Sequence, residues 1–174
     1  GHGQNRLNSC FGYGEDGPTL LYKTIAQNFN IKLDGYVEVG FDAVKAIVNA
    51  VGGVDIELTE SEAAYLNATN YIRPAKYRNV KAGKHTLNGA QALGYSRIRK
   101  TAKGITPVTP NGKMDDYGRT WRQRNVINAV FNKAKGTSLP KLMDLAQTIL
   151  SKYVTTDLSS QDIIGYMKDV VMMG

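Results

Sequence analysis

Residues 36–58 read YVEVGFDAVKAIVNAVGGVDIEL, and this stretch decides the fold. Polar and apolar residues alternate over residues 36–41, which predicts a β-strand. Apolar residues then recur at helical spacing, at Val44, Ile47, Val48 and Val51. Gly52 and Gly53 predict the end of this helix, because glycine readily adopts the left-handed conformation of a C-cap. Residues 54–58 are predicted to be a second strand.

Further helical patterns flank this segment on both sides. Pro18 suits the first turn of a helix in which Leu21, Ile25 and Phe29 recur at helical spacing. Towards the C-terminus, residues 139–150 form another amphipathic pattern. Strands that alternate with helices predict an α/β fold, in which a mixed central β-sheet is flanked by helices on both faces in three α-β-α layers.

The composition is that of a globular domain. The chain has 174 residues, of which 42% are hydrophobic and 21% are charged, so we expect residues 1–174 to form a single domain. The net charge of +7 favours anionic partners such as nucleic acid, acidic glycopolymers or anionic membrane surfaces, without selecting one. The single cysteine, Cys10, excludes an intrachain disulfide. No run approaches the ~18 to 20 apolar residues of a membrane-spanning helix.

A second stretch, residues 87–123, carries the candidate site. It reads LNGAQALGYSRIRK, continues through a long polar loop and ends with DDYGRTWRQ. Arg97 and Arg99 are two residues apart, a spacing that puts both side chains on one side of an extended strand but splays them around a helix. Residues Tyr95 to Arg99 are therefore predicted to form a strand.

A helix is predicted to follow the loop. Asp116 is a good N-cap residue, and Arg119 and Gln123 then extend an apolar stripe that continues from Val126. A guanidinium at the end of a core-facing stripe needs a partner, because burying it unpaired is costly. With few acids nearby and a helix N-terminus close by, a phosphate or pyrophosphate is the natural partner.

Local ion pairs are the alternative interpretation of these arginines. Arginines near the start of a helix usually lie at the surface or pair with nearby acids. Asp115 and Asp116 are both available for such pairs. The spacing alone leaves both interpretations open.

The motifs taken together resemble a known family. The pattern LNGxQALxYxRxR at residues 87–99, followed by DxGRTxRQ at residues 116–123, closely resembles the signature of the LytR-CpsA-Psr family. Residues 36–58 resemble the strand-helix-strand segment of that family. Near the N-terminus, Arg6 occupies the basic position of the family's segment that precedes an aromatic-glycine stretch. The resemblance extends from Arg6 to about Val170.

This resemblance implies a membrane-anchored, extracytoplasmic phosphotransferase. Such enzymes take a glycopolymer, for example wall teichoic acid or capsular polysaccharide, from a polyprenyl-pyrophosphate carrier and join it to peptidoglycan through a phosphodiester. They hold the prenyl tail in an apolar channel and the pyrophosphate among arginines, with the assistance of Mg2+. The expected partners are thus the lipid-linked glycopolymer, peptidoglycan and the membrane, through an N-terminal anchor outside this chain, and not nucleic acid.

The resemblance also assigns expected roles to individual residues. The expected pyrophosphate-binding residues are Arg97, Arg99, Arg119, Gln123 and Arg6. Asp116 is expected to cap the helix in the first place, or else to hold an arginine, and Arg122 either assists binding or serves the structure. In the family, the catalytic aspartates and an Arg-Asp-Thr motif lie upstream of the position where this chain begins, so no catalytic residue or metal ligand is named. We therefore expect an incomplete sheet and little transferase activity from this chain alone.

The loop at residues 100–115 is about ten residues longer than the family's common loop. It is a candidate lid or substrate-selectivity loop, with a neutral surface insertion as the alternative.

Other functions remain open as alternatives. One is a non-catalytic module that binds polyprenyl phosphate or glycopolymer. Another is a transcriptional regulator or attenuator that binds nucleic acid. A third is a phosphatase or pyrophosphatase that uses the same arginines with water as the acceptor.

Overall fold

The strand β2 (Val54–Leu58) lies at the centre of the core. In the computed structural model, which describes residues 6–13 and 16–172, the side chains of Val54, Ile56 and Leu58 are buried and the acidic residues between them are exposed. This alternation follows from the two-residue period of a strand, so the sequence determines which face turns to the core. β2 pairs antiparallel with β3 (Gly83–Leu87), and Val54 lies opposite Leu87.

The remaining elements follow in chain order. The α-helices are α1 (Gly17–Phe29), α2 (Phe41–Ala50), α3 (Glu60–Ala68), α4 (Gly89–Arg97), α5 (Asp115–Lys135), α6 (Leu139–Tyr153) and α7 (Ser160–Met172). The 3-10 helices are η1 (Leu7–Gly12) and η2 (Ala75–Tyr77). The two other strands are β1 (Val37–Val39) and β4 (Val154–Thr156). No helix in the described ranges is both long enough and apolar enough to cross a membrane.

The α/β class is confirmed, and the described strands form two separate antiparallel pairs. β1 pairs with β4, with Val37 opposite Thr156 and Val39 opposite Val154, while β2 pairs with β3. Where the sequence predicts one central sheet, the described residues thus form two small sheets of two strands each. The strand-helix-strand prediction for residues 36–58 is confirmed by β1, α2 and β2, and Gly52 and Gly53 have the predicted positive φ of 81° and 92°.

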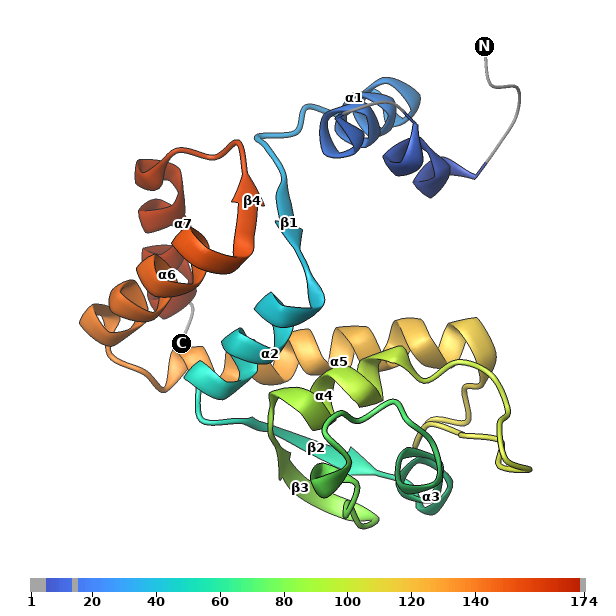
Figure 1. Ribbon diagram of the computed structural model, residues 1–174. Helices are drawn as coiled ribbons and strands as arrows, with labels where there is room; N and C mark the ends of the chain where they lie inside the picture. The colour runs from blue at the N-terminus through green and yellow to red at the C-terminus, as the bar shows by residue number, and fades with distance from the viewer. Residues whose placement is uncertain (1–5, 14–15, 173–174) are drawn as a thin grey trace.

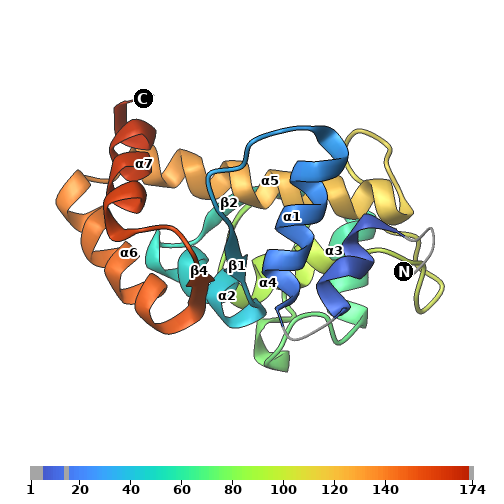
Figure 2. The same cartoon turned by 90° about the horizontal axis from the view of Figure 1, so that it is seen from above.

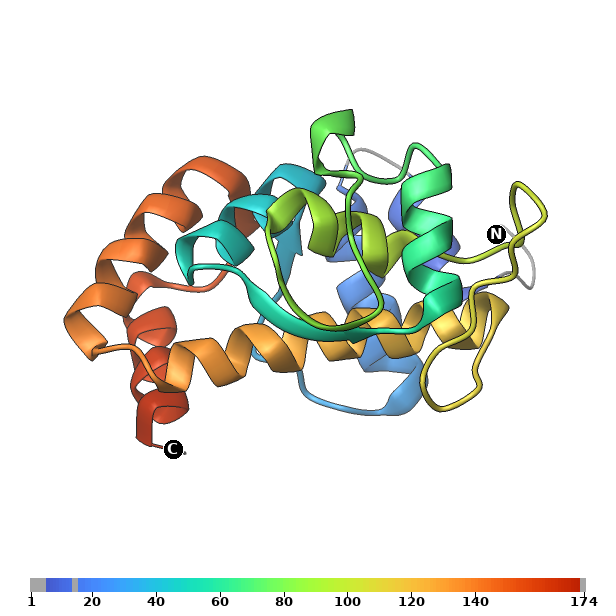
Figure 3. The same ribbon diagram turned by 90° about the horizontal axis from the view of Figure 1, so that it is seen from below.

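Helix α5 runs along the core and contacts α4, β2 and α7. Figures 1 and 3 show α5 spanning the length of this region, with α4 and β2 packed against it. Its residues Val126 and Ala129 join the buried cluster around β2. Seen from above in Figure 2, η1 and α1 lie towards one end of the molecule, and α6 and α7 lie towards the other.

The predicted strand at Tyr95 to Arg99 is wrong. These residues belong to the end of α4 and the start of the following loop, since α4 runs to Arg97. The helix is started by a capping box, in which the side chain of Asn88 accepts a hydrogen bond from the Gln91 backbone N–H and that of Gln91 accepts one from the Asn88 backbone N–H. This reciprocal cap satisfies two of the free N–H groups at a helix start and favours helix over strand.

The glycine of the same motif explains how α4 packs against α2. The backbone N–H of Gly89 donates to Asn49 Oδ1 at 2.8 Å. A Cβ at this position would lie 2.3 Å from the carbonyl oxygen of Lys45, so only glycine allows the two helices to approach this closely. The close approach fixes the position of α4 and therefore of the arginines that follow.

Candidate functional site

One carboxylate holds two of the predicted arginines. Asp116 Oδ1 lies 2.6 Å from Arg119 Nη2 and 3.3 Å from Arg99 Nε. The three side chains are half-exposed, and ion pairs of this kind contribute only about 0 to 1 kcal/mol to folding. The main consequence of the contact is therefore geometric: two guanidinium groups from different segments lie side by side at the start of α5.

The predicted capping role of Asp116 is wrong. Helix α5 begins at Asp115, and its N-cap residue is Met114, which makes no side-chain cap hydrogen bond. Asp116 thus lies inside the first turn, near the positive end of the helix dipole, where a carboxylate is favourable. Its role is the second of the two predicted, that of holding an arginine, and it holds Arg99 as well as Arg119.

Arg119 has an unsatisfied donor. Its Nε atom is buried and has no hydrogen-bond partner among the described residues. A buried N–H without a partner costs about 1 to 3 kcal/mol, and such a group often marks a place where a ligand or ion binds. The Arg119 side chain therefore has donor capacity beyond its contact with Asp116.

Arg97 has different partners from Arg99. Its guanidinium carbon lies 4.6 Å from the centre of the Phe41 ring and 5.6 Å from the centre of the Tyr71 ring, a geometry of cation–π contacts. Between the two arginines, Ile98 is fully buried and follows the last residue of α4. Because α4 ends there, the predicted side-by-side arrangement of Arg97 and Arg99 on a strand is not observed.

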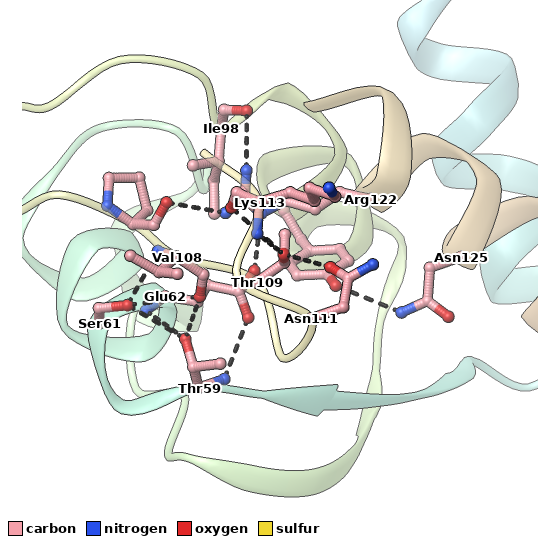
Figure 4. A network of polar contacts seen from close by, with 12 residues as sticks. Thr59, Ser61, Glu62, Ile98, Val108, Thr109, Asn111, Lys113, Arg122 and Asn125 are labelled. Atoms are coloured by element: carbon pink, nitrogen blue, oxygen red, sulfur yellow. Dashed lines mark hydrogen bonds and ion pairs between the residues drawn. The ribbon is translucent and has the colours of Figure 1, made fainter. Parts of the chain in front are cut away.

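Arg122 is a buried structural residue. Its Nε atom donates to Glu62 Oε1 at 2.7 Å, and its other nitrogens donate to the carbonyl oxygens of Ile98 at 3.3 Å and Pro107 at 3.1 Å (Figure 4). Both members of the ion pair have no exposed surface. Of the two predicted roles, serving the structure is the one observed, and Arg122 does so by fixing the backbone between Arg97 and Arg99.

The middle of the loop at residues 100–115 is anchored. The Thr59 hydroxyl donates to the Val108 carbonyl at 2.7 Å, and the Val108 N–H donates to Ser61 Oγ at 3.0 Å (Figure 4). Thr109 is buried and bonds both the N–H and the carbonyl of Lys113. These contacts argue against a lid that moves as a rigid unit. They are compatible both with a selectivity loop and with a neutral insertion.

Gln123 and Arg6 remain predictions. Gln123 is exposed and lies one turn after Arg119 on α5. Arg6 is exposed and directly precedes η1, near the N-terminal end of the described chain. The structure thus brings together Arg99, Arg119 and Asp116, whereas Arg97 contacts Phe41 and Tyr71.

The described residues do not form a metal site on their own. They contain no group of three or more His, Cys, Asp or Glu side chains that could hold an ion. Asp116 is occupied by two arginines, which leaves Asp115 as the only acid beside it in the first turn. The Mg2+ expected from the resemblance finds no ligand set here, and no chemical step is assigned to it.

Three residues that matter to this region were not predicted. Phe41 and Tyr71 contact Arg97 from distant parts of the sequence, and Glu62 neutralises Arg122 across 60 positions. A local signal existed only for Glu62, since Thr59 and Glu62 form a capping box at the start of α3. Nothing in the sequence pattern pairs Glu62 with Arg122.

The chain is similar in sequence to proteins of a known family. Residues 1–173 match the family described as the LytR_cpsA_psr family. The chain is 33% identical over 162 residues to the polyisoprenyl-teichoic acid--peptidoglycan teichoic acid transferase TagU of Enterococcus faecalis, covering 92% of this chain and 45% of that protein. It is 29% identical over 167 residues to the corresponding transferase TagT of Bacillus subtilis, covering 95% of this chain and 46% of that protein.

The chain is also similar to a solved structure. TagT bound to LIIa-WTA is similar with a TM-score of 0.71 at 26% identity, over 98% of this chain and 57% of that chain. The chain spans less than half the length of the two curated relatives.

Proposed function

The chain belongs to the LytR-CpsA-Psr family, and from this membership we propose that it acts in the transfer of an anionic glycopolymer from a polyprenyl-pyrophosphate carrier to peptidoglycan. The names of TagU and TagT, both peptidoglycan teichoic acid transferases, support a polymer of the teichoic acid type. A capsular polysaccharide is the other polymer class that this proposal includes. The reaction class is phosphotransfer in cell-wall assembly.

The observation that carries the proposal is the arrangement of Arg99 and Arg119 on one oxygen of Asp116. Two guanidinium groups held side by side offer several N–H donors to the oxygens of a pyrophosphate, and arginine binds such oxygens in a bidentate fashion. The buried Nε of Arg119 adds a donor that has no partner among the described residues. We infer that the pyrophosphate of the carrier binds here, with Arg97, Gln123 and Arg6 as further contacts.

The chemistry follows from the charge that develops during transfer. A hydroxyl of peptidoglycan attacks the phosphorus that carries the glycopolymer, a new P–O bond forms, and the P–O bond to the polyprenyl phosphate breaks. The leaving polyprenyl phosphate takes the electron pair, and the hydroxyl proton is released. Phosphoryl transfer asks a protein mainly to position groups and to stabilise charge. Arg99 and Arg119 would stabilise the leaving phosphate.

The proposal includes a location. An acceptor in peptidoglycan and a lipid-linked donor meet at the extracytoplasmic face of the bacterial membrane, so we propose that the protein acts there. The names of the relatives, which pair a polyisoprenyl carrier with peptidoglycan, support this location.

Calorimetric binding of a short-chain polyprenyl pyrophosphate tests the proposal. We expect Arg99→Ala and Arg119→Ala each to weaken binding by about 10- to 100-fold, because each removes a charge-assisted contact worth roughly 1.5 to 3 kcal/mol. Arg124→Ala, on the same helix and exposed, is the matched control and should bind like the parent chain. Binding that is absent, or equal in all three variants, would reject the site.

The reaction products distinguish transfer to peptidoglycan from hydrolysis and from binding without turnover. With the full-length protein, a mixture of lipid-linked polymer and peptidoglycan fragments should yield a phosphodiester-linked product. Release of free polymer phosphate would instead indicate water as the acceptor, and binding without turnover would indicate a non-catalytic module. Duplex DNA binding that falls steeply with salt would favour the regulator hypothesis.

A further inference from the structure

The loop at residues 100–115 is built from two tight turns. In the first, Ala102 and Ile105 exchange backbone hydrogen bonds of 3.1 and 3.0 Å across Lys103 and Gly104. Lys103 and Gly104 both have positive φ, of 54° and 72°, as in the type I′ turn of a β-hairpin. This left-handed conformation favours Asn and Gly, so the backbone gives no reason for a lysine there. The turn therefore presents a charged side chain at its tip.

Both turns are fixed to the core. Ala102 and Ile105 pack against the buried cluster around β2. In the second turn, the Gly112 N–H donates to the Thr109 carbonyl at 2.9 Å, and the Lys113 N–H donates to the Thr109 hydroxyl at 2.8 Å. Thr109 is itself buried. The tips of the loop are therefore held at defined positions before any partner binds.

The loop is strongly basic. Lys100, Lys103 and Lys113 are exposed, and none of them forms an ion pair with a carboxylate among the described residues. The chain has no Asp or Glu between Glu62 and Asp115, and Asp115 is the only acid in the loop. The three lysines outweigh that single carboxylate, so the loop attracts anions.

Apolar side chains stand beside these lysines. Met114 is 46% exposed, and Tyr117, in the first turn of α5, is 81% exposed. Lysine and tyrosine keep a polar tip in water while their apolar parts are buried in a lipid interface, and tyrosine is enriched where proteins meet membranes. A soluble polyanion would contact the lysines alone. The combination of lysines with exposed apolar side chains favours a lipid surface.

The ends of the loop fix its level relative to the membrane. Arg99 directly precedes the loop and Arg119 follows it, and Asp116 holds both guanidinium groups. On the proposed function, this pair binds the pyrophosphate of a polyprenyl carrier, whose tail is apolar and whose pyrophosphate lies among lipid headgroups. The loop leaves from that level and returns to it. Figures 1 and 3 show the loop (yellow) at one end of α5, with α6 at the other end.

We propose that this loop docks on an anionic lipid surface. Lys100, Lys103 and Lys113 lie among the phosphate groups, and Met114 and Tyr117 enter the interface. The lysines add attraction that salt screens, and the buried apolar area adds attraction that salt does not screen. The inference rests on the proposed function, because the pyrophosphate of the carrier sets the level of the loop, but it concerns lipids that are not the substrate. Docking brings the arginine pair to the headgroups among which the carrier lies.

Sedimentation with lipid vesicles that contain no polyprenyl pyrophosphate tests the docking. Vesicles of equal parts phosphatidylglycerol and phosphatidylcholine should bind the chain at least about tenfold more tightly than vesicles of phosphatidylcholine alone. The double variant Lys103→Gln with Lys113→Gln should lose about tenfold or more of this affinity, because each lysine contributes about fivefold. Equal binding of the parent chain to both kinds of vesicle would overturn the proposal.

A matched double variant controls for net charge. Lys141→Gln with Lys152→Gln removes the same charge from exposed positions on α6, at the other end of α5. Because charges so far from the surface are screened, this variant should change vesicle binding by no more than about twofold. Equal losses in the two double variants would overturn the proposal, since net charge alone would then explain the binding.

A third variant distinguishes a lipid surface from a soluble polyanion. Met114→Gln with Tyr117→Gln keeps the charges and removes the apolar contact, so it should weaken binding to the anionic vesicles by about threefold or more. Its binding to inorganic polyphosphate should equal that of the parent chain. Both residues are exposed, and an unchanged thermal unfolding temperature would verify that the variant is folded. Vesicle binding that this variant leaves unchanged, or an equal loss with polyphosphate, would overturn the proposal in favour of a soluble polyanion.

The docking and the proposed function fail separately. Calorimetry with polyprenyl pyrophosphate tests the arginine pair through Arg99→Ala and Arg119→Ala, whereas vesicles without that lipid test the loop through its lysines. Pyrophosphate binding that persists in both arginine variants, together with lysine-dependent vesicle binding, would reject the proposed pyrophosphate site and leave a lipid-binding loop. Pyrophosphate binding that depends on the arginines, with no binding to anionic vesicles, would reject the docking alone.

Discussion

Asp116 Oδ1 lies 2.6 Å from Arg119 Nη2, and the same oxygen accepts the longer contact from Arg99 Nε at 3.3 Å. A single oxygen thus aligns a guanidinium from the end of the Arg-x-Arg motif with one from the first turns of α5. The carboxylate has two opposing effects on an incoming anion. It orients the two donors, and its negative charge repels the ligand.

Asn and Ala substitutions at Asp116 separate these effects. Asp116→Asn keeps an oxygen acceptor but removes the charge, so we expect it to raise the affinity for inorganic pyrophosphate by about threefold or more at low salt. Asp116→Ala removes the orienting acceptor too and should gain less. Calorimetry at two salt concentrations measures both. Weaker binding by the Asn variant than by the parent chain would show that the carboxylate charge is itself required.

The buried pair of Arg122 and Glu62 gives a prediction about stability. Arg122→Met leaves the Glu62 carboxylate buried without its cation, which should lower the free energy of unfolding by about 3 to 5 kcal/mol. Adding Glu62→Gln removes that charge and keeps an acceptor for the Thr59 N–H, so the double variant should be more stable than the single one. Urea denaturation measures both, with the exposed Arg124→Met as control. A double variant less stable than Arg122→Met would contradict the argument.

These contacts show what the sequence pattern can and cannot supply. The strand-helix-strand prediction for residues 36–58 depends on local periodicity, and β1, α2 and β2 follow it. The partner of Arg122 lies 60 positions away, and the aromatic rings around Arg97 come from two other segments. Side-chain periodicity carries no information about such distant pairs, so the sequence names the candidate arginines but not the residues that contact them.

The error at Tyr95 to Arg99 had a different cause. The spacing of Arg97 and Arg99 predicts a strand, whereas Asn88 and Gln91 carry the pattern of a capping box and predict a helix start. The helix ends within the motif, so Ile98 turns into the core and the two arginines contact different partners. A helix end between these two arginines cannot be predicted from their spacing alone.

Gly89 gives a prediction about helix packing. Gly89→Ala should lower the free energy of unfolding by about 1 to 3 kcal/mol, because its Cβ would meet the Lys45 carbonyl oxygen at 2.3 Å and push α2 from α4. Gly165→Ala in α7 is the matched control, since its Cβ would have no atom within 4 Å and alanine favours a helix by about 0.5 to 1 kcal/mol. Thermal unfolding of both variants measures the two changes in stability. Equal changes would mean that the close approach of α4 to α2 is unimportant for stability.

Tyr95 gives a prediction about alkaline pH. Burial, and then the nearby Glu62 charge, raise the pKa of the Tyr95 phenol well above its ordinary value of about 10. In the unfolded chain the phenol ionises near pH 10, whereas in the folded protein it stays protonated. The unfolded state then binds fewer protons than the folded state, so the free energy of unfolding falls as the pH rises above about 10.

Tyr95→Phe isolates this contribution. At pH 8 the variant should be less stable by about 1 kcal/mol, because it loses the contact in which Asn125 Nδ2 donates to the Tyr95 hydroxyl at 3.3 Å. Above about pH 10 the difference should shrink and can reverse, since phenylalanine has no phenol whose ionisation favours the unfolded chain. Urea denaturation from pH 8 to about pH 11 measures the difference, and Tyr117→Phe, at a residue that is 81% exposed, controls for the loss of a hydroxyl. A difference between Tyr95→Phe and the parent chain that stays constant with pH would contradict the assignment, because a buried neutral phenol must lose its stabilising contribution once the unfolded chain ionises.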